Sequence, residues 1–182
     1  MTARTLYSCT MSLDGFMAGP GGDMQWLVPH LGPNPVADDL VGRIGSLLVG
    51  RRTHDGDDPN RGTDHEGAFG GQWRGPVFVL THNPPAEAPG DPDLTFMTDL
   101  PSAVAAARSA AGGKYVNVLG ADVARGCLEA GLLDEILVLV APVLLGDGTR
   151  LFDWPGGHRV DLVKRHVSDA ATATNLWFDI QR

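Results

Sequence analysis

The stretch Lys114 to Ile136, KYVNVLGADVARGCLEAGLLDEI, contains the pattern that decides the fold. It begins with a short apolar run, residues 115–119, whose length and β-branched side chains predict a buried strand. A turn at Gly120 follows, and apolar residues then recur at helical spacing until Gly131. A second strand pattern comes directly afterwards, at residues 136–140. This order indicates a βαβ-like unit whose turn exposes backbone N–H groups at a helix N-terminus, where phosphate binds readily.

Length, composition and charge restrict the class of protein. The 182 residues predict a single domain over residues 1–182. A net charge of −8 argues against binding to nucleic acid or to anionic membranes, and the chain has no long apolar run. Its two cysteines, Cys9 and Cys127, lie in apolar segments without metal-ligand spacing. We therefore expect free thiols and a cytoplasmic location.

The remaining elements complete an α/β pattern. Helices are predicted from Asn34, which can cap the helix that begins at Pro35, and over residues 101–111. The predicted strands are residues 4–11, 47–49, 76–81 and 94–97, and a final pair at 160–167 and 172–180. Helices and strands in this order predict a mixed, mostly parallel sheet with helices on its faces and a C-terminal antiparallel hairpin.

Two polar segments follow predicted strands. Gly50, Arg51, Arg52 and Thr53 come after the second strand, and two guanidiniums with a hydroxyl suit a phosphate group. Adjacent arginines are also common as plain surface charge. Thr81 and His82 end the third strand, at the sheet edge where ligands bind in open α/β folds. A histidine there can equally belong to a surface turn.

The glycine-rich segment Ser12–Trp26 predicts a loop after the first strand. Asp14, before a glycine, is either a turn residue that bonds its own backbone or a substrate contact at the mouth of a cleft. Trp26 either packs over the edge of the core or stacks on a substrate. Residues 55–75 are polar and glycine-rich, which is typical of a long lid or a disordered segment. Their acidic residues lack ligand spacing, so we predict no metal site.

Five motifs in this order carry a family resemblance: SLDGFMAG, GRRTHD, FVLTHNP, VLGADVARGCLEAGLLDE and APVLLGDGTRLF. Together they resemble the dihydrofolate-reductase-like family that includes the C-terminal reductase domain of bifunctional riboflavin-biosynthesis deaminase/reductases. The resemblance covers essentially the whole chain. It implies a three-layer α/β/α fold, NADPH as the cofactor, a small-molecule substrate and a homodimer, with the terminal hairpin around Trp177 as a possible apolar patch.

The resemblance also implies roles for particular residues. Phosphate contacts fall on the segment after the second strand, and the 2′-phosphate of the adenosine lies near the segment after the third. The nicotinamide lies along the segment after SLDG, and the turn of the opening stretch faces the pyrophosphate. The implied cofactor-binding residues are Met17, Ala18, Gly50, Arg51, Arg52, Thr53, Thr81, His82, Leu119, Gly120, Ala121, Asp122 and Val123. Asp14 is the candidate catalytic residue, and Asp14 with Trp26 the candidate substrate contacts.

The chain departs from the folate enzymes at two points. Ala121 replaces the second glycine of their glycine pair, and Leu31 stands where they place a substrate-anchoring carboxylate. We therefore expect an NADPH-dependent reductase of a small polar heterocyclic or carbonyl substrate, and not a true dihydrofolate reductase. Two alternatives remain open at this stage. One is a reductase of a ribosylated pyrimidine, as in riboflavin biosynthesis, and the other a non-catalytic nucleotide-binding dimer.

Overall fold

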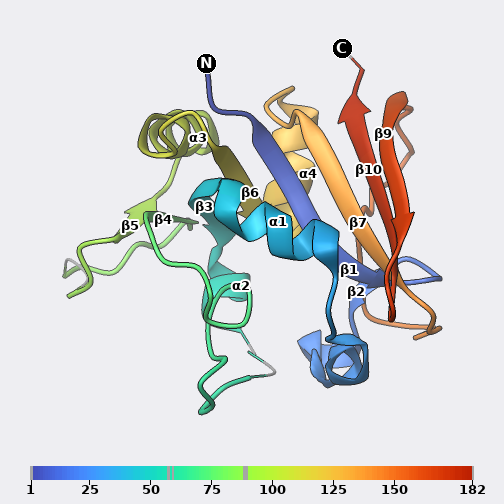
Figure 1. Cartoon of the computed structure of the whole chain (residues 1–182). Helices are drawn as coiled ribbons and strands as arrows, with labels where there is room; N and C mark the ends of the chain where they lie inside the picture. Colours follow the sequence, from blue (N-terminus) through green and yellow to red (C-terminus); the bar gives the residue numbers. More distant parts are fainter. Residues whose placement is uncertain (1, 57, 59, 88–89, 182) are drawn as a thin grey trace. The chain divides into compact units, whose positions relative to one another are not determined.

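A computed structural model of the chain describes residues 2–56, 58, 60–87 and 90–181 (Figure 1). The chain divides into two compact units. The first consists of Met1–Tyr7, Arg43–Gly56 and Arg74–Asp134, and the second of Ser8–Gly42, Asp57–Trp73 and Glu135–Arg182. Strand β1, Thr5–Ser12, runs through both. Our prediction of one domain over the whole chain remains a prediction.

The first unit is built on parallel strands in the order β5-β4-β3-β6-β1. Its strands besides β1 are β3 (Ile44–Gly50), β4 (Val77–Leu80), β5 (Leu94–Met97) and β6 (Tyr115–Leu119). Its helices are α2 (Arg51–His54), α3 (Leu100–Ala110) and α4 (Ala121–Glu129). Leu48, Val79, Val116 and Val118 are fully enclosed, which explains why the strand sequences are continuous apolar runs.

Helix α3 is fixed to β3 at very short range. Asp99 caps the helix, because its carboxylate accepts a hydrogen bond from the Ser102 backbone N–H at 2.9 Å. Ser46 of β3 donates from its hydroxyl to the carbonyl of Ala107 at 2.8 Å. A Cβ at Gly45 would lie 2.1 Å from the carbonyl oxygen of Ala111, so only glycine permits this approach.

The second unit carries the antiparallel part of the fold. Its strand order is β1-β7-β10-β9, with β7 at Glu135–Ala141, β9 at Leu162–Asp169 and β10 at Thr174–Ile180. Strand β10 pairs antiparallel with both neighbours. A separate two-stranded sheet joins β2 (Phe16–Ala18) to β8 (Thr149–Arg150), and the helical segments are η1 (Pro20–Gly22), η2 (Gln25–His30) and α1 (Pro35–Arg43).

Helix α1 begins as its sequence predicts. The side-chain oxygen of Asn34 accepts hydrogen bonds from the backbone N–H groups of Val36 at 3.2 Å and Ala37 at 3.4 Å. The Asn34 amide also exchanges two hydrogen bonds with that of Asn175 on β10, at 2.7 and 3.1 Å. Both asparagines are buried, so this pair holds the helix start against the hairpin.

A buried polar group connects the strands of the terminal hairpin to β7. Glu135 is fully enclosed, and its carboxylate accepts a hydrogen bond from Trp177 Nε1 at 2.7 Å. Arg165 approaches the same carboxylate at 3.2 Å and lies 5.6 Å above the Trp177 ring. Trp177 is only 5% exposed, so it does not form the apolar patch suggested from the sequence. The exposed large apolar residues of the hairpin are Leu162, Val163 and Val167, all on β9.

The mixed, mostly parallel sheet and the C-terminal antiparallel hairpin predicted from the sequence are confirmed. The helix predicted from Pro35 ends at Arg43, and β3 begins at Ile44. One detail differs, because the loop predicted at residues 12–26 contains β2, whose pairing with β8 could not be inferred from such short segments. No helix among the described residues is long and apolar enough to cross a membrane.

Candidate functional site

The carboxyl ends of three neighbouring strands lie at one edge of the sheet in the first unit. The register pairs Gly50 of β3 with Leu80 of β4, and Val49 of β3 with Leu119 of β6. Helix α2, the segment from Thr81 and the turn into α4 therefore leave the sheet at the same edge. Ligands of open α/β sheets bind outside this edge, so the structure brings these predicted site segments together.

Arg51 is held in place from two sides. Its Nε donates a hydrogen bond to the carboxylate of Asp55, and its guanidinium lies 5.3 Å above the ring of Phe96. His54 contacts the same ring edge-on at 5.9 Å and places Nδ1 2.8 Å from the Asp55 carboxylate. Hydrogen bonds from Arg51, and then from His54, lower the pKa of Asp55. Within the described part of the chain, neither Nη group of Arg51 has a hydrogen-bond partner, so a planar pair of donors is fixed and available.

Thr53 meets the turn between β6 and α4. A Cβ at Gly120 would lie 2.5 Å from the Thr53 hydroxyl oxygen, and Gly120 has a φ of +100°. Gly50 makes room for α4 in a similar way, because a Cβ there would lie 3.1 Å from Val123. Leu119 and Ala121, on either side of Gly120, are half-buried. The end of β3 and the start of α4 thus pack closely, because the backbone of Gly120 lies against the Thr53 side chain and the backbone of Gly50 against the Val123 side chain.

The second arginine is engaged differently. Nη2 of Arg52 pairs with the Asp122 carboxylate in the first turn of α4. Asp122 also lies 3.5 Å from the guanidinium of Arg125. The Arg52 side chain is 87% exposed and that of Asp122 55% exposed, so this is an ion pair in contact with solvent. A carboxylate in the first turn of α4 therefore already pairs with Arg52.

The segment after β4 supplies one buried and one exposed polar residue. Thr81 is buried, donates its N–H to the Met97 carbonyl at 2.9 Å, and accepts from the backbone N–H of Asn83 at 3.2 Å. His82 is exposed. The hydroxyl of Thr81 thus shapes the turn that presents His82 at the ligand edge.

Asp14 belongs to the second unit and ties two loops together. Its carboxylate accepts hydrogen bonds from the Ser12 hydroxyl at 2.6 Å and from the backbone N–H groups of Leu145 at 3.1 Å and Gly146 at 2.8 Å. The Ser12 bond, followed by those of Gly146 and Leu145, lowers the pKa of Asp14 to about 2. At neutral pH this carboxylate is ionised, so it accepts hydrogen bonds and does not donate a proton.

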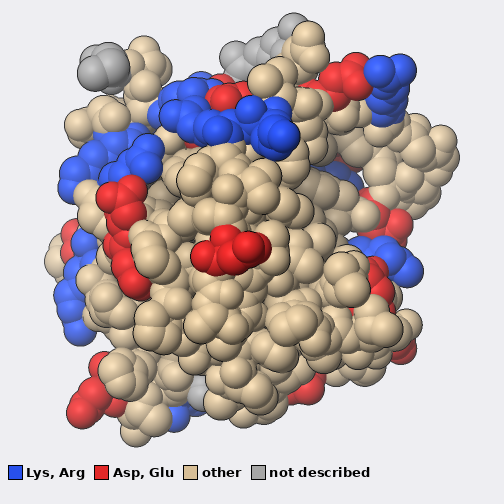
Figure 2. Space-filling model, turned by 45° about the vertical axis from the view of Figure 1, so that its right-hand side comes forward, with Lys and Arg blue, Asp and Glu red and all other residues tan. Residues whose placement is uncertain are grey.

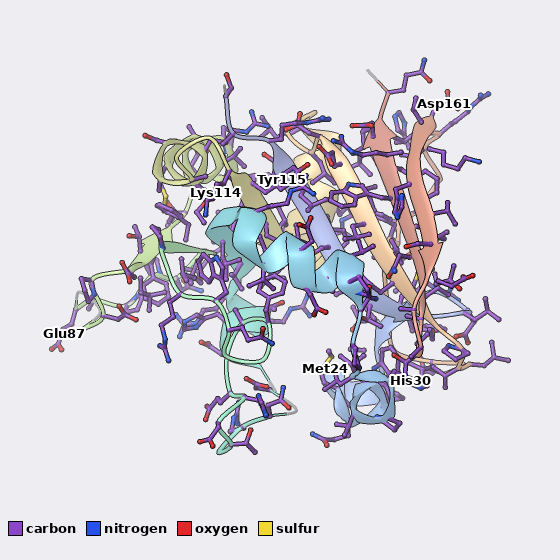
Figure 3. The ribbon with its side chains drawn as sticks, viewed as in Figure 1. Met24, His30, Glu87, Lys114, Tyr115 and Asp161 are labelled. Carbon is purple, nitrogen blue, oxygen red and sulfur yellow. The ribbon has the colours of Figure 1, made fainter. Side chains whose placement is uncertain are left out.

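The other predicted residues of the second unit lie on β2 and η2. Met17 is half-buried on β2, while Ala18 is buried and its carbonyl approaches Gly148 so closely that a Cβ there would lie 2.0 Å away. Trp26 is half-buried in η2, the helical turn between the labelled Met24 and His30 in Figure 3, with its ring 6.2 Å from that of His30. Its indole Nε1 is enclosed without a hydrogen-bond partner among the described residues.

Comparison with protein families and solved structures identifies the family and the fold of the chain. The model of the RibD C-terminal domain matches residues 5–174. The chain belongs to the RibD C-terminal domain family. This confirms the resemblance drawn from the five motifs, and the family is reductase-like. No curated protein matches the chain.

Solved structures agree on the fold of this RibD C-terminal-type chain. A putative riboflavin biosynthesis protein from Shewanella sp. PV-4 superposes with a TM-score of 0.76 at 24% identity, and all of both chains is covered. The riboflavin biosynthesis reductase Rib7 of Saccharomyces cerevisiae gives 0.64 at 13% identity, covering 100% of this chain and 90% of the yeast protein. A dihydrofolate reductase from Enterococcus faecalis, complexed with NADP(H), gives 0.59 at 17% identity with full coverage of both chains. These likenesses confirm the dihydrofolate-reductase-like fold.

Sequence reasoning missed three members of the site in this RibD-type domain. Phe96, His54 and Asp55 hold Arg51, yet none was a candidate. His54 and Asp55 stand inside the motif GRRTHD, so their nearness to Arg51 was available as a signal. Phe96 lies about forty residues further on, and only the pairing of β4 with β5 brings it to this edge.

Charged side chains of the chain are frequently paired. Basic and acidic groups both appear on the face drawn in Figure 2, several of them as neighbours. In the segment 55–75, Asp58 accepts hydrogen bonds from the N–H groups of Asn60 and Gly67 at 2.8 and 2.7 Å, and Glu66 accepts from Gly62 at 2.9 Å. These two carboxylates fold the segment on itself. Among the residues placed by the structure, no group of three or more side chains could hold a metal ion.

Proposed function

We propose that this chain is an NADPH-dependent reductase of a small polar heterocyclic or carbonyl compound. The observation that carries the proposal is the fixed guanidinium of Arg51 at the ligand edge of the first unit. Phe96 and Asp55 set its orientation, which lowers the entropy lost when it binds a phosphate through both Nη groups. The hydroxyl of Thr53 and the close turn at Gly120 lie on the same edge, so the residues present fit a phosphorylated dinucleotide.

The chain's own contribution would be to bind and orient the cofactor, since NADPH supplies the hydride when it is bound. We assign the phosphate contacts to Arg51 and Thr53, and the neighbourhood of the adenosine 2′-phosphate to Thr81 and His82. The backbone at Gly120 and the start of α4 would face the pyrophosphate, because the unpaired N–H groups of a helix N-terminus favour anions.

Residues of the second unit keep the roles that the resemblance implies. Met17 and Ala18 would lie along the nicotinamide, and Asp14 and Trp26 would contact the substrate. In that role the ionised Asp14 carboxylate would serve as a hydrogen-bond acceptor.

A second candidate is the reduction of a 5-amino-6-ribosylaminopyrimidine, which the family match favours. The two candidates differ only in substrate. Oxidation of NADPH, followed by its absorbance, would separate them when a ribosylated aminopyrimidine is tested beside simple heterocycles and carbonyl compounds. Binding of NADPH without turnover of any of these would instead support a non-catalytic nucleotide-binding protein.

Cofactor binding can be tested with one variant and a matched control. Arg51→Met removes the guanidinium and keeps an apolar side chain against Phe96, so we expect the NADPH dissociation constant to rise about 10- to 100-fold. Arg159→Gln makes the same charge change at an exposed residue that pairs with Asp161 elsewhere in the chain. That variant should bind NADPH as the wild type does. Equal binding by Arg51→Met and the wild type in a fluorescence titration would contradict the proposal.

A homodimer is proposed from the resemblance alone. Sedimentation at micromolar concentration tests it directly, and a monomer would remove the claim.

A further inference from the structure

The ion pair of Arg52 and Asp122 lies beside the proposed phosphate site. Arg52 follows β3 and Asp122 stands in the first turn of α4, while the strands that precede them are neighbours in register. The packing of Thr53 on Gly120 and of Val123 on Gly50 fixes the two segments against each other. This packing keeps the carboxylate of Asp122 within reach of the Arg52 guanidinium.

Asp122 also lies where a helix attracts anions. The N-terminus of α4 carries partial positive charge and unpaired N–H groups, and Gly120 at its start offers no side-chain cap. Asp122 and the guanidiniums of Arg52 and Arg125 surround this end. One negative group is thus already present at a position whose other charges favour a phosphate.

We propose that Asp122 lowers the affinity of the site for the cofactor, because its carboxylate competes with the phosphates for Arg52. An arriving pyrophosphate must displace the carboxylate from the guanidinium and then remain near its negative charge. Arg51, whose Nη groups have no partner among the described residues, requires no such exchange. The two adjacent arginines therefore differ in function. Arg51 can bind a phosphate directly, whereas Arg52 can bind one only after the Asp122 carboxylate has been displaced. This inference rests on the proposed function.

Removing the charge should strengthen binding. For Asp122→Asn we expect the dissociation constants of NADPH and of inorganic pyrophosphate to fall about three- to tenfold at low ionic strength, the factor for removing one like charge near a solvent-exposed phosphate. Glu129→Gln is the matched control, because it removes the same charge from the other end of α4, where Glu129 lies 3.8 Å from Arg125. This control should change both constants less than twofold, and salt should diminish the gain of Asp122→Asn.

The double variant Asp122→Asn/Arg52→Gln identifies the partner. If the gain comes from a freed Arg52, the double variant should lose it and bind pyrophosphate about as the wild type does. Calorimetry with pyrophosphate and fluorescence with NADPH measure binding without turnover. Unchanged or weaker binding of pyrophosphate by Asp122→Asn would overturn the inference, because the carboxylate would then be neutral or would orient Arg52. If no variant binds NADPH but Asp122→Asn gains affinity for pyrophosphate, the competition stands and the proposed cofactor is wrong.

Discussion

Gly120 offers a direct test of the packing that builds the candidate site. Its φ of +100° is a conformation that side chains rarely adopt, and a Cβ would lie 2.5 Å from the hydroxyl oxygen of Thr53. We expect Gly120→Ala to lose about 1–3 kcal/mol of unfolding free energy from backbone strain alone. Displacement of Thr53 adds a steric cost of about 1 kcal/mol or more. For a chain of this length the total corresponds to a fall in melting temperature of roughly 4–16 °C.

Two further variants separate strain from steric overlap. Gly112→Ala is the matched control, because Gly112 has a φ of +59° and no atom within 4 Å of a Cβ placed there. It should lose only about 1–2 kcal/mol. Thr53→Ala removes the overlapping oxygen and leaves the Thr53 Cβ 3.5 Å from the new methyl group, an ordinary contact. Combined with Gly120→Ala, it should recover the steric part of the loss.

Thermal and urea unfolding give the required free energies. A coupling of about 0.5–3 kcal/mol between the substitutions at Gly120 and Thr53 would confirm that they are in contact. The reasoning fails if Gly120→Ala is no less stable than Gly112→Ala, or if the two substitutions simply add. Either result would mean that the end of β3 and the turn into α4 do not pack as the structure shows.

The second unit provides two further predictions. Glu135→Ala removes the buried acceptor of Trp177 Nε1 and the partner of Arg165, so urea unfolding should show a loss of about 2–5 kcal/mol, whereas Glu135→Gln, which keeps an acceptor, should lose less. A loss no smaller for Gln than for Ala would contradict this. For Asp14, whose pKa is lowered to about 2, the folded state gains stability above the unfolded pKa of about 4 and loses the gain as the pH falls toward 2. Asp14→Asn should therefore melt below the wild type at pH 7, and the difference should shrink from pH 4 to pH 2; a constant difference over that range would refute the assignment.

Local patterns were sufficient for most of the fold. The apolar run at residues 115–119 and the asparagine cap of α1 both correspond to elements in the structure. They were predictable because each depends on residues within one or two helical turns. The pairing of β2 with β8 was not, because a two-residue strand has no periodicity to detect. Its partners are also more than a hundred residues apart in the chain.

The terminal hairpin illustrates a different limit. Alternation in β10 correctly separates Trp177 from its neighbours Leu176 and Phe178, but it does not tell which face is enclosed. The hydrogen bond from the indole N–H of Trp177 to the buried Glu135 carboxylate determines that the Trp177 face is the enclosed one. A carboxylate at the start of β7 carries no sequence signal for such a role, since glutamate is usually exposed.

The adjacent arginines show most clearly what a sequence cannot distinguish. Arg51 and Arg52 have the same side chain and neighbouring positions, and both were predicted to contact phosphate. Their difference arises from where the chain places other residues. In the first turn of α2 one guanidinium meets Phe96 and Asp55, and the other meets Asp122. The first pairing leaves two donors fixed for a ligand, and the second covers a donor with an exposed carboxylate. Whether each arginine can serve the proposed phosphate site therefore depends on its partners as much as on the arginine itself.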